Sequence, residues 1–201
     1  DVFRRRDWQK IFDITYEDVQ WVATGEWLTK ETWEKYAREQ PEGMVNHHYV
    51  KEDWMVTALE WPGMMVSTDA LPAMDRDILA NPNIAGTFSR VLGHYVRDTG
   101  VLTLPEALAR MSLLQARWLE QVSPAFSKKG RLQEGADADI VIFDPDSVAA
   151  NATYGDPYLK PTGIEHVLVA GRPVVVDGER IEGRYPGRKL LGAITNREQR
   201  K

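Results

Sequence analysis

A short apolar run that ends on a carboxylate constrains this chain more than any other stretch. Residues 63–72 form the run Gly-Met-Met-Val-Ser-Thr-Asp-Ala-Leu-Pro, with turn residues at both ends. This pattern predicts a buried strand with Asp69 at its carboxyl end. Where strands and helices alternate around a barrel, that end faces the active site, which makes Asp69 a candidate for catalysis or metal binding. The alternative is a turn or helix-capping aspartate.

The segments before this run predict strands and helices in alternation. Residues 44–50 are expected to form a strand and residues 51–60 an amphipathic helix. Together with the strand at 63–68 they make the strand, helix, strand unit of a parallel sheet. Thr29 is a suitable N-cap for an earlier helix, which Pro41 would end.

Further helices are predicted after Asp69. Residues 86–98 carry apolar side chains on one helical face. Thr103 and Glu106 have the spacing of a capping box, so another helix is expected to begin there and continue through residue 119. The opening residues 1–16 are rich in charge and aromatics, and we expect a short strand with irregular flanks among them.

The end of the chain has the pattern of antiparallel strands. Residues 140–143, Ile-Val-Ile-Phe, predict one strand. The apolar runs at 167–169 and 174–176 lie on either side of a turn at 170–173 and predict a β-hairpin, with the next turn at 177–178. The expected fold class is therefore α/β, with a β-rich C-terminal portion.

Composition excludes several classes of partner. The 201 residues carry a net charge of −5, and their basic side chains form no stripe that could follow a phosphate backbone. No apolar run approaches the ~20 residues that span a bilayer. The chain has no cysteine for disulfides or thiolate metal ligands. We therefore expect a cytoplasmic protein that binds neither nucleic acid nor membrane.

Several segments, in order, resemble one known family. They are residues 63–69, the run Gly-Thr-Phe-Ser-Arg-Val-Leu-Gly at 86–93, and the run Gly-Arg-Leu-Gln-Glu-Gly-Ala-Asp-Ala-Asp-Ile-Val-Ile-Phe-Asp-Pro at 130–145. Residues 163–169 and 186–188 agree with the same pattern. Most of the chain thus resembles the C-terminal part of the amidohydrolase superfamily. More narrowly, it is similar to the N-acyl-D-amino-acid deacylase (D-aminoacylase) branch.

The resemblance implies a metal-dependent (β/α)8 TIM-barrel hydrolase that carries a small β-sandwich. Residues 1–122 would supply the last strands and helices of the barrel with an N-terminal insertion segment, and residues 123–201 a β-sandwich portion and C-terminal tail. A whole barrel takes roughly 250 residues. We therefore expect this chain to be the C-terminal portion of a longer enzyme or one subunit of a split one, with an N-terminal amidohydrolase fragment or subunit completing the barrel.

The resemblance also implies chemistry for Asp69. In this family, histidines on earlier strands and a bridging ligand hold one or two zinc ions. An aspartate at the end of the eighth strand takes a proton from the metal-bound water and passes it to the leaving nitrogen. Asp69 matches that aspartate, and we also consider it as a metal contact.

Two departures from the branch bear on the substrate. The branch carries His-Pro-Arg before the Gly-Thr-Phe motif, and that arginine is expected to clamp the substrate carboxylate. This chain has Asn81-Pro82-Asn83 there, so an ion pair to a free amino-acid carboxylate would be missing. The usual Ser-Asp-Gly is replaced by Thr68-Asp69-Ala70, which keeps the acid.

Four further side chains are candidates for contact with a small-molecule amide substrate. His47 aligns with a histidine common in the branch and is expected to line the pocket. Asn81 and Asn83 lie in the loop that follows Asp69, although asparagines beside a proline are also ordinary turn residues. Arg90 could orient this loop or a carboxylate, and a structural ion pair is the alternative.

Other chemistry-bearing residues are expected to be structural. His48, His94 and His166 are predicted to pack or to face solvent. Asp137 and Asp139 have the spacing of a calcium pair, but the family places them far from the site. The seven tryptophans are expected mainly in the core.

The sequence therefore predicts the C-terminal portion or subunit of a zinc-dependent amidohydrolase. It would hydrolyse a linear amide bond, as in an N-acyl amino acid or a peptide-like substrate, with Asp69 as proton shuttle. The alternatives are a non-catalytic partner chain that retains the fold, and a hydrolase of cyclic amides.

Overall fold

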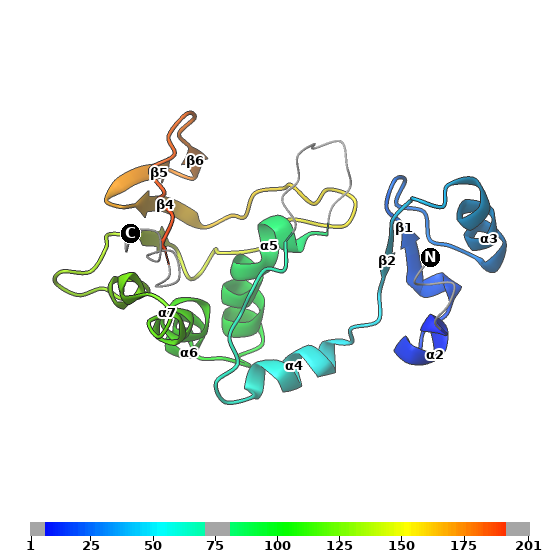
Figure 1. Cartoon of the computed structure of the whole chain (residues 1–201), viewed down its shortest axis with the longest axis horizontal. Coiled ribbons are helices and arrows are strands. Elements are labelled where there is room, and N and C mark those ends of the chain that lie inside the picture. Colours follow the sequence, from blue (N-terminus) through cyan, green and yellow to red (C-terminus); the bar gives the residue numbers. More distant parts are fainter. Residues whose placement is uncertain (1–6, 71–80, 192–201) are drawn as a thin grey trace, which may run out of the picture. The chain divides into compact units, whose positions relative to one another are not determined.

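The computed structural model describes residues 7–70 and 81–191 (Figure 1). They belong to two compact units. The first comprises the described residues of Asp1–Thr57, Asp69–Ala85 and Ala152–Leu159. The second comprises those of Ala58–Thr68, Gly86–Asn151 and Lys160–Lys201.

The first unit begins with helix α2 (Trp8–Phe12), where we expected a strand. For the described part of the opening segment that expectation is wrong, and residues 1–6 lie outside the described residues. The reason lies in spacing, because Trp8, Ile11 and Phe12 are three and four positions apart and share one face of a helix. Asp13 ends the helix with a left-handed φ of 54°.

Two short strands follow, and they pair antiparallel. The 3-10 turn η1 (Tyr16–Asp18) leads into β1 (Val19–Trp21), which lies beside β2 (Val45–His47). In their register Val19 faces His47 and Trp21 faces Val45. The strand predicted at 44–50 is thus confirmed for residues 45–47 only, and its partner is the antiparallel strand β1 and not a parallel neighbour.

Helix α3 (Lys30–Glu39) begins at Thr29 as predicted. The Thr29 hydroxyl accepts the backbone N–H of Thr32 at 3.3 Å, and the Thr32 hydroxyl accepts the N–H of Thr29 at 2.8 Å. Two of the four orphan N–H groups at this helix end are therefore satisfied by side chains. The helix ends before Pro41, and its C-cap is Gln40.

Aromatic side chains form most of the core of the first unit. Trp8 packs against Trp33 with ring centroids 4.9 Å apart, and Trp21 stacks on Tyr36 at 4.3 Å with an interplanar angle of 3°. Large flat rings bury much apolar area in few residues, which is how so small a unit obtains a core. The buried members of this cluster are Trp8, Ile14, Val19, Trp21 and Leu28.

Helix α4 (Glu52–Glu60) confirms the helix predicted at 51–60. The segment after it does not form the predicted strand, and residues 63–68 belong to neither sheet of the described chain. Val66 shows why, since its N–H donates to the Arg110 carbonyl at 3.0 Å and its carbonyl accepts the Gln115 side-chain amide at 2.9 Å. Groups that a strand would offer to a neighbouring strand are bound here to helical residues.

A long helical region follows. Helix α5 (Asn83–Arg90) runs on as the π-type segment η2 (Val91–Asp98), which agrees with the helix predicted at 86–98. Then come α6 (Leu104–Leu108), η3 (Ala109–Leu113), α7 (Leu114–Leu119) and the 3-10 segment η4 (Pro124–Lys128). The predicted capping box opens α6, with the N–H of Thr103 donating to the Glu106 carboxylate at 2.9 Å. Among residues 7–70 and 81–191, no helix is long and apolar enough to cross a membrane.

The second unit carries a four-stranded antiparallel sheet, which contains the strand predicted at 140–143 and the hairpin predicted at 167–176. Its strands lie in the order β3 (Ile140–Phe143), β4 (Ile164–Val169), β5 (Arg172–Val176) and β6 (Glu179–Arg180). The hairpin between β4 and β5 is confirmed. Its turn is tighter than expected, because Arg172 pairs with Val169 as part of β5.

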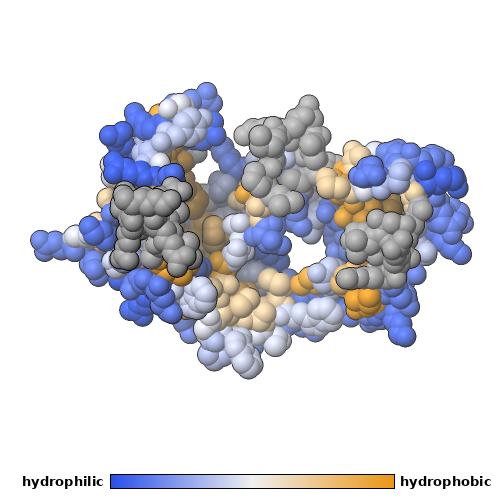
Figure 2. Space-filling view, viewed as in Figure 1, coloured by the Kyte–Doolittle hydropathy of each residue, from blue (hydrophilic) through white to orange (hydrophobic). Residues whose placement is uncertain are grey.

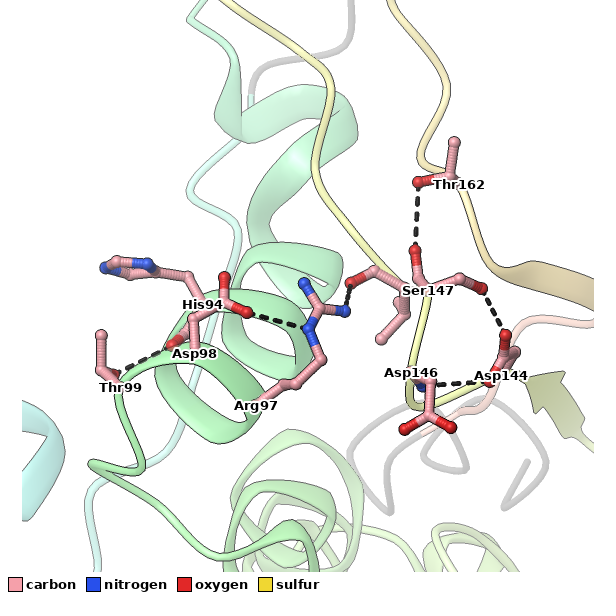
Figure 3. Close-up of polar contacts among 9 residues, drawn as sticks. His94, Arg97, Asp98, Thr99, Asp144, Asp146, Ser147 and Thr162 are labelled. Atoms are coloured by element: carbon pink, nitrogen blue, oxygen red, sulfur yellow. Dashed lines mark hydrogen bonds and ion pairs between the residues drawn. The ribbon is translucent and has the colours of Figure 1, made fainter.

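The backbone of Val148 joins the helical and β-rich parts of the second unit. Val148 is fully buried, and its carbonyl accepts a hydrogen bond from the Arg97 guanidinium at 2.6 Å. Figure 3 labels Arg97 and Ser147, the residue before Val148. Gly93 in η2 leaves room for this approach, since a Cβ there would lie 2.5 Å from the Val148 oxygen. Gly163 does the same from the other side, where a Cβ would lie 2.5 Å from the Val148 nitrogen.

Both units also expose large apolar side chains (Figure 2). Trp27 and Trp54 in the first unit and Trp61 and Trp118 in the second are exposed, which corrects the expectation that the tryptophans lie mainly in the core. Trp61 keeps 71% and Trp118 60% of its surface accessible. Residues 7–70 and 81–191 do not cover these four side chains.

Replacing Gly93 with alanine is expected to destabilise the second unit. The added methyl would meet the Val148 carbonyl oxygen at 2.5 Å. This overpacking costs about 1–3 kcal/mol and outweighs the better helix propensity of alanine, about 1 kcal/mol. Urea unfolding of the purified protein would measure the loss.

Gly187→Ala is the matched control, because a Cβ at Gly187 meets nothing within 4 Å. It should leave the unfolding midpoint unchanged. A Gly93→Ala protein as stable as the wild type would contradict the close packing around Val148.

Candidate active site around Asp69

Asp69 follows the segment 63–68 and is exposed. Its backbone has a left-handed φ of 48°, a conformation that aspartate and asparagine adopt more readily than most residues. Its carbonyl oxygen accepts a hydrogen bond from the side-chain amide of Asn83 at 3.4 Å. The exposed side chain of Asp69 therefore extends from a backbone that Asn83, 14 positions later in the chain, helps to hold.

The two asparagines of the Asn-Pro-Asn motif shape the start of α5. The Asn81 side-chain oxygen accepts the backbone N–H of Asn83 at 3.2 Å, and the Asn81 carbonyl accepts the N–H of Ile84 at 3.1 Å. This is the turn chemistry by which asparagine caps a helix. The structure thus brings Asp69, Asn81 and Asn83 together, with Asn81 as the cap and Asn83 as the link to Asp69.

His47 lies in the aromatic cluster of the first unit. Its ring centroid is 5.1 Å from Trp8, 6.0 Å from Phe12 and 6.1 Å from Trp33. Burial lowers the pKa of His47, and the neighbouring His48 lowers it further. The ring thus prefers the neutral form and packs as an aromatic side chain, while pocket lining by His47 stays a prediction.

His48 is packed as well, as the sequence predicted. Its ring lies 4.6 Å from Trp27 and 4.5 Å from Tyr154. Burial lowers its pKa, and the charge of Asp18 opposes this shift. Because the rings of both histidines are partly buried in aromatic surroundings, protonating them in the folded chain is unfavourable.

Arg90 is the last residue of α5 and is exposed in the second unit. Its guanidinium lies over the ring of Tyr95, 5.5 Å from the centroid. The positive charge of Arg90 is attracted to the face of this ring. A contact of Arg90 with the substrate stays a prediction.

Metal ligands are sparse in the described chain. Within residues 7–70 and 81–191, no three His, Asp or Glu side chains gather closely enough to hold a metal ion. A zinc site needs three or four protein ligands, so these residues do not fit a complete metal centre. Asp69 could contribute at most one ligand to such a centre.

The spacing of Asp137 and Asp139 has a structural explanation. The Lys129 ammonium lies 2.9 Å from Asp137 and 2.5 Å from Asp139. Asp139 also accepts the backbone N–H of Ala170 at 2.8 Å, and the bond from Lys129 holds its pKa below the ordinary range. A cation of the chain itself therefore occupies the position that calcium would take.

The first unit also has a pocket of about 260 Å³, and Asp69, Asn81 and Asn83 are not among the residues that line it. Trp21, Trp33 and Tyr36 line it together with the turn after α3. Glu42 is its only titratable lining residue apart from Tyr36 among those described. Such walls suit an apolar group and offer no set of acid, base and nucleophile.

Comparison with known proteins identifies the class of this chain. Residues 15–175 match the model of the Amidohydrolase family, and the chain belongs to that family. Within the family it is similar to deacylases of N-acylated D-amino acids. It is 46% identical over 107 residues to N-acyl-D-glutamate deacylase of Alcaligenes xylosoxydans xylosoxydans, a match to 53% of this chain and 20% of the relative.

Two further relatives support this assignment. D-aminoacylase from the same organism is 33% identical over 184 residues, or 91% of this chain and 36% of the relative. The solved structure of N-acyl-D-glutamate deacylase from Bordetella bronchiseptica, with zinc and a phosphonate that mimics the tetrahedral intermediate, matches with a TM-score of 0.68 and 35% identity. That match covers 83% of this chain and 37% of the solved one. The chain therefore spans little more than a third of these relatives' length.

The sequence did not reveal how these side chains are held. The bond from Asn83 to the Asp69 backbone crosses 14 positions, and Arg97 reaches Val148 across 51. The Asn-Pro-Asn motif did signal a turn, and the asparagine at its first position is a recognisable cap. No local pattern signals the second asparagine's bond to Asp69.

We expect acid to destabilise the first unit through His47 and His48. Their pKa values are lowered by burial in the folded chain, whereas the unfolded chain titrates near the ordinary value of about 6.5. The contribution of these two neutral rings to the free energy of unfolding is therefore fully present above about pH 6.5. It decreases as the pH drops from there towards the folded pKa values. Urea midpoints followed by tryptophan fluorescence between pH 7.5 and 5.5 would record this fall.

Replacing both histidines with phenylalanine should flatten the pH dependence. His166→Phe, on the sheet of the second unit, is the matched control and should leave the slope of the first unit in place. Equal wild-type midpoints across the range would show that the two rings do not resist protonation.

Proposed function

We propose that this chain is the C-terminal part of a zinc-dependent amidohydrolase that cleaves a linear amide bond, with Asp69 as the proton shuttle. Membership of the Amidohydrolase family supports the reaction class. The zinc-containing deacylase from B. bronchiseptica supports the choice of metal. The single observation that carries the role of Asp69 is an exposed aspartate at the end of the 63–69 motif, whose backbone carbonyl is bound by Asn83 at the start of α5.

Amide hydrolysis needs such a group. An amine leaves only when its nitrogen is protonated, and the attacking water must lose a proton. A carboxylate that takes the proton from water and returns it to nitrogen serves both needs. Asp69 is the residue of this chain that we assign to that transfer.

The substrate is proposed to be an N-acyl amino acid or a peptide-like amide. Asn83 is neutral, so this position can donate hydrogen bonds to a substrate carboxylate but cannot form an ion pair with it. We therefore expect the enzyme to accept substrates that lack a free α-carboxylate as well as those that have one. His47, Asn81, Asn83 and Arg90 remain our candidates for contact with the substrate.

The remaining metal ligands and barrel strands are proposed to come from an N-terminal portion or partner subunit. The matched relatives are nearly three times as long as the region they share with this chain. The exposed tryptophans of both units provide apolar surface for such a portion to cover. We also propose that barrel elements extend to residue 122 and that residues 123–201 form the sandwich portion and tail.

Replacing Asp69 with asparagine in the metal-loaded enzyme that contains this chain should abolish proton transfer. We expect kcat to fall by roughly 10²- to 10⁴-fold, the usual contribution of general acid and base catalysis. Hydrolysis would be followed with N-acetyl-D-glutamate, N-acetyl-D-leucine and a dipeptide.

Asp177→Asn is the matched control. Asp177 has a φ of 51°, close to that of Asp69, and lies in the turn between β5 and β6. It should keep normal kcat. If Asp69→Asn hydrolyses at the wild-type rate, Asp69 is not the shuttle. A wild-type assembly with neither zinc nor turnover would favour a non-catalytic partner chain.

A further inference from the structure

We propose that Asn83 is a positioning residue for Asp69, which rests on the proposed role of Asp69 as the proton shuttle. A chain of contacts leads from the start of α5 to the Asp69 backbone. In this arrangement Asn83 acts on the rate of the reaction through Asp69.

The Asp69 backbone needs a restraint. Its φ of 48° lies in the left-handed region, which is uncommon for residues other than glycine. The Asn83 amide binds the Asp69 carbonyl oxygen at 3.4 Å and so restrains the peptide plane that follows Asp69. Holding that plane limits how the Cα–Cβ bond of Asp69 can turn, and the carboxylate extends from this bond through the side-chain torsions.

Asn83 is itself held in place. Its backbone N–H donates to the Asn81 side chain at 3.2 Å, and Asn83 is the first residue of α5. A side chain on the first turn of a helix is a firmer anchor than one on an irregular loop. Asn81 fixes the helix start, Asn83 extends from it, and Asp69 is held by Asn83.

Positioning and substrate contact make different kinetic predictions. A residue that only binds substrate changes KM when it is removed and leaves kcat in place. A residue that aligns the proton shuttle changes kcat, because misplacement by about 1 Å can cost 10²-fold in rate. The bond from Asn83 to the Asp69 backbone favours the second behaviour.

Kinetics of the metal-loaded enzyme that contains this chain would test the proposal. The probe is whichever of N-acetyl-D-glutamate, N-acetyl-D-leucine and the dipeptide the enzyme hydrolyses fastest. Asn83→Ala should lower kcat by roughly 10- to 100-fold, in addition to any rise in KM that the loss of a substrate contact causes. Asn83→Gln keeps the amide donor and should recover part of the loss. If Asn83→Ala does not fold, Asn83→Asp removes the donor with the same shape and should show the same loss of kcat.

Asn151→Ala is the matched control. Its amide also donates to a backbone carbonyl, that of Lys160 at 3.0 Å, but in the second unit. It should leave kcat and KM unchanged. A general loss of structure would affect both alanine variants alike.

A double-mutant cycle separates the two proposals. In the Asp69→Asn background, Asn83→Ala should cause no further loss of kcat, because its effect runs through the carboxylate. An additional loss, an increase in KM alone, or a normal Asn83→Ala enzyme would overturn the positioning role while Asp69→Asn stays inactive. An active Asp69→Asn enzyme would instead overturn the proposed shuttle and the positioning role with it.

Discussion

The second unit depends on one buried backbone carbonyl, that of Val148. A buried carbonyl without a partner would cost free energy comparable to a lost hydrogen bond, and the Arg97 guanidinium removes this cost. Arg97 comes from η2, whereas Val148 lies in the irregular segment between β3 and β4. Gly93 and Gly163 present no side chains to the same backbone, so both can lie close to it. Helices and sheet of this unit therefore meet at a contact that leaves little room for added side-chain atoms.

The elements predicted correctly are those whose signals are local. Helices α3 and α6 follow from caps within a few residues of their starts, and the β4–β5 hairpin follows from two apolar runs around a glycine turn. Helix α2 was missed although its spacing is helical, because charge and aromatics dominate the opening segment. The error at 63–68 has another cause. An apolar run specifies burial, but whether it is a strand depends on which groups bind its backbone, and Val66 is bound by Arg110 and Gln115.

The sequence predicts which residues belong to the candidate site, but not the contacts between them. Asp69 was found from its place after an apolar run and from the ordered motifs around it. Asn81 as a turn residue followed from the proline beside it. The link from Asn83 to Asp69 and the lysine between Asp137 and Asp139 depend on contacts between distant positions. The sequence shows that residues suited to such contacts are present, but no local pattern shows which distant positions come together.

The left-handed backbone of Asp69 limits which acids this position can hold. Aspartate tolerates that conformation because its short side chain can bond locally, whereas the longer glutamate lacks this compensation. The backbone therefore discriminates between two side chains with the same functional group before any chemistry is considered. A change to glutamate would keep the charge but would favour another φ, so the carboxylate would leave its place as the turn relaxed. At this position the backbone conformation and the type of acidic residue therefore depend on each other.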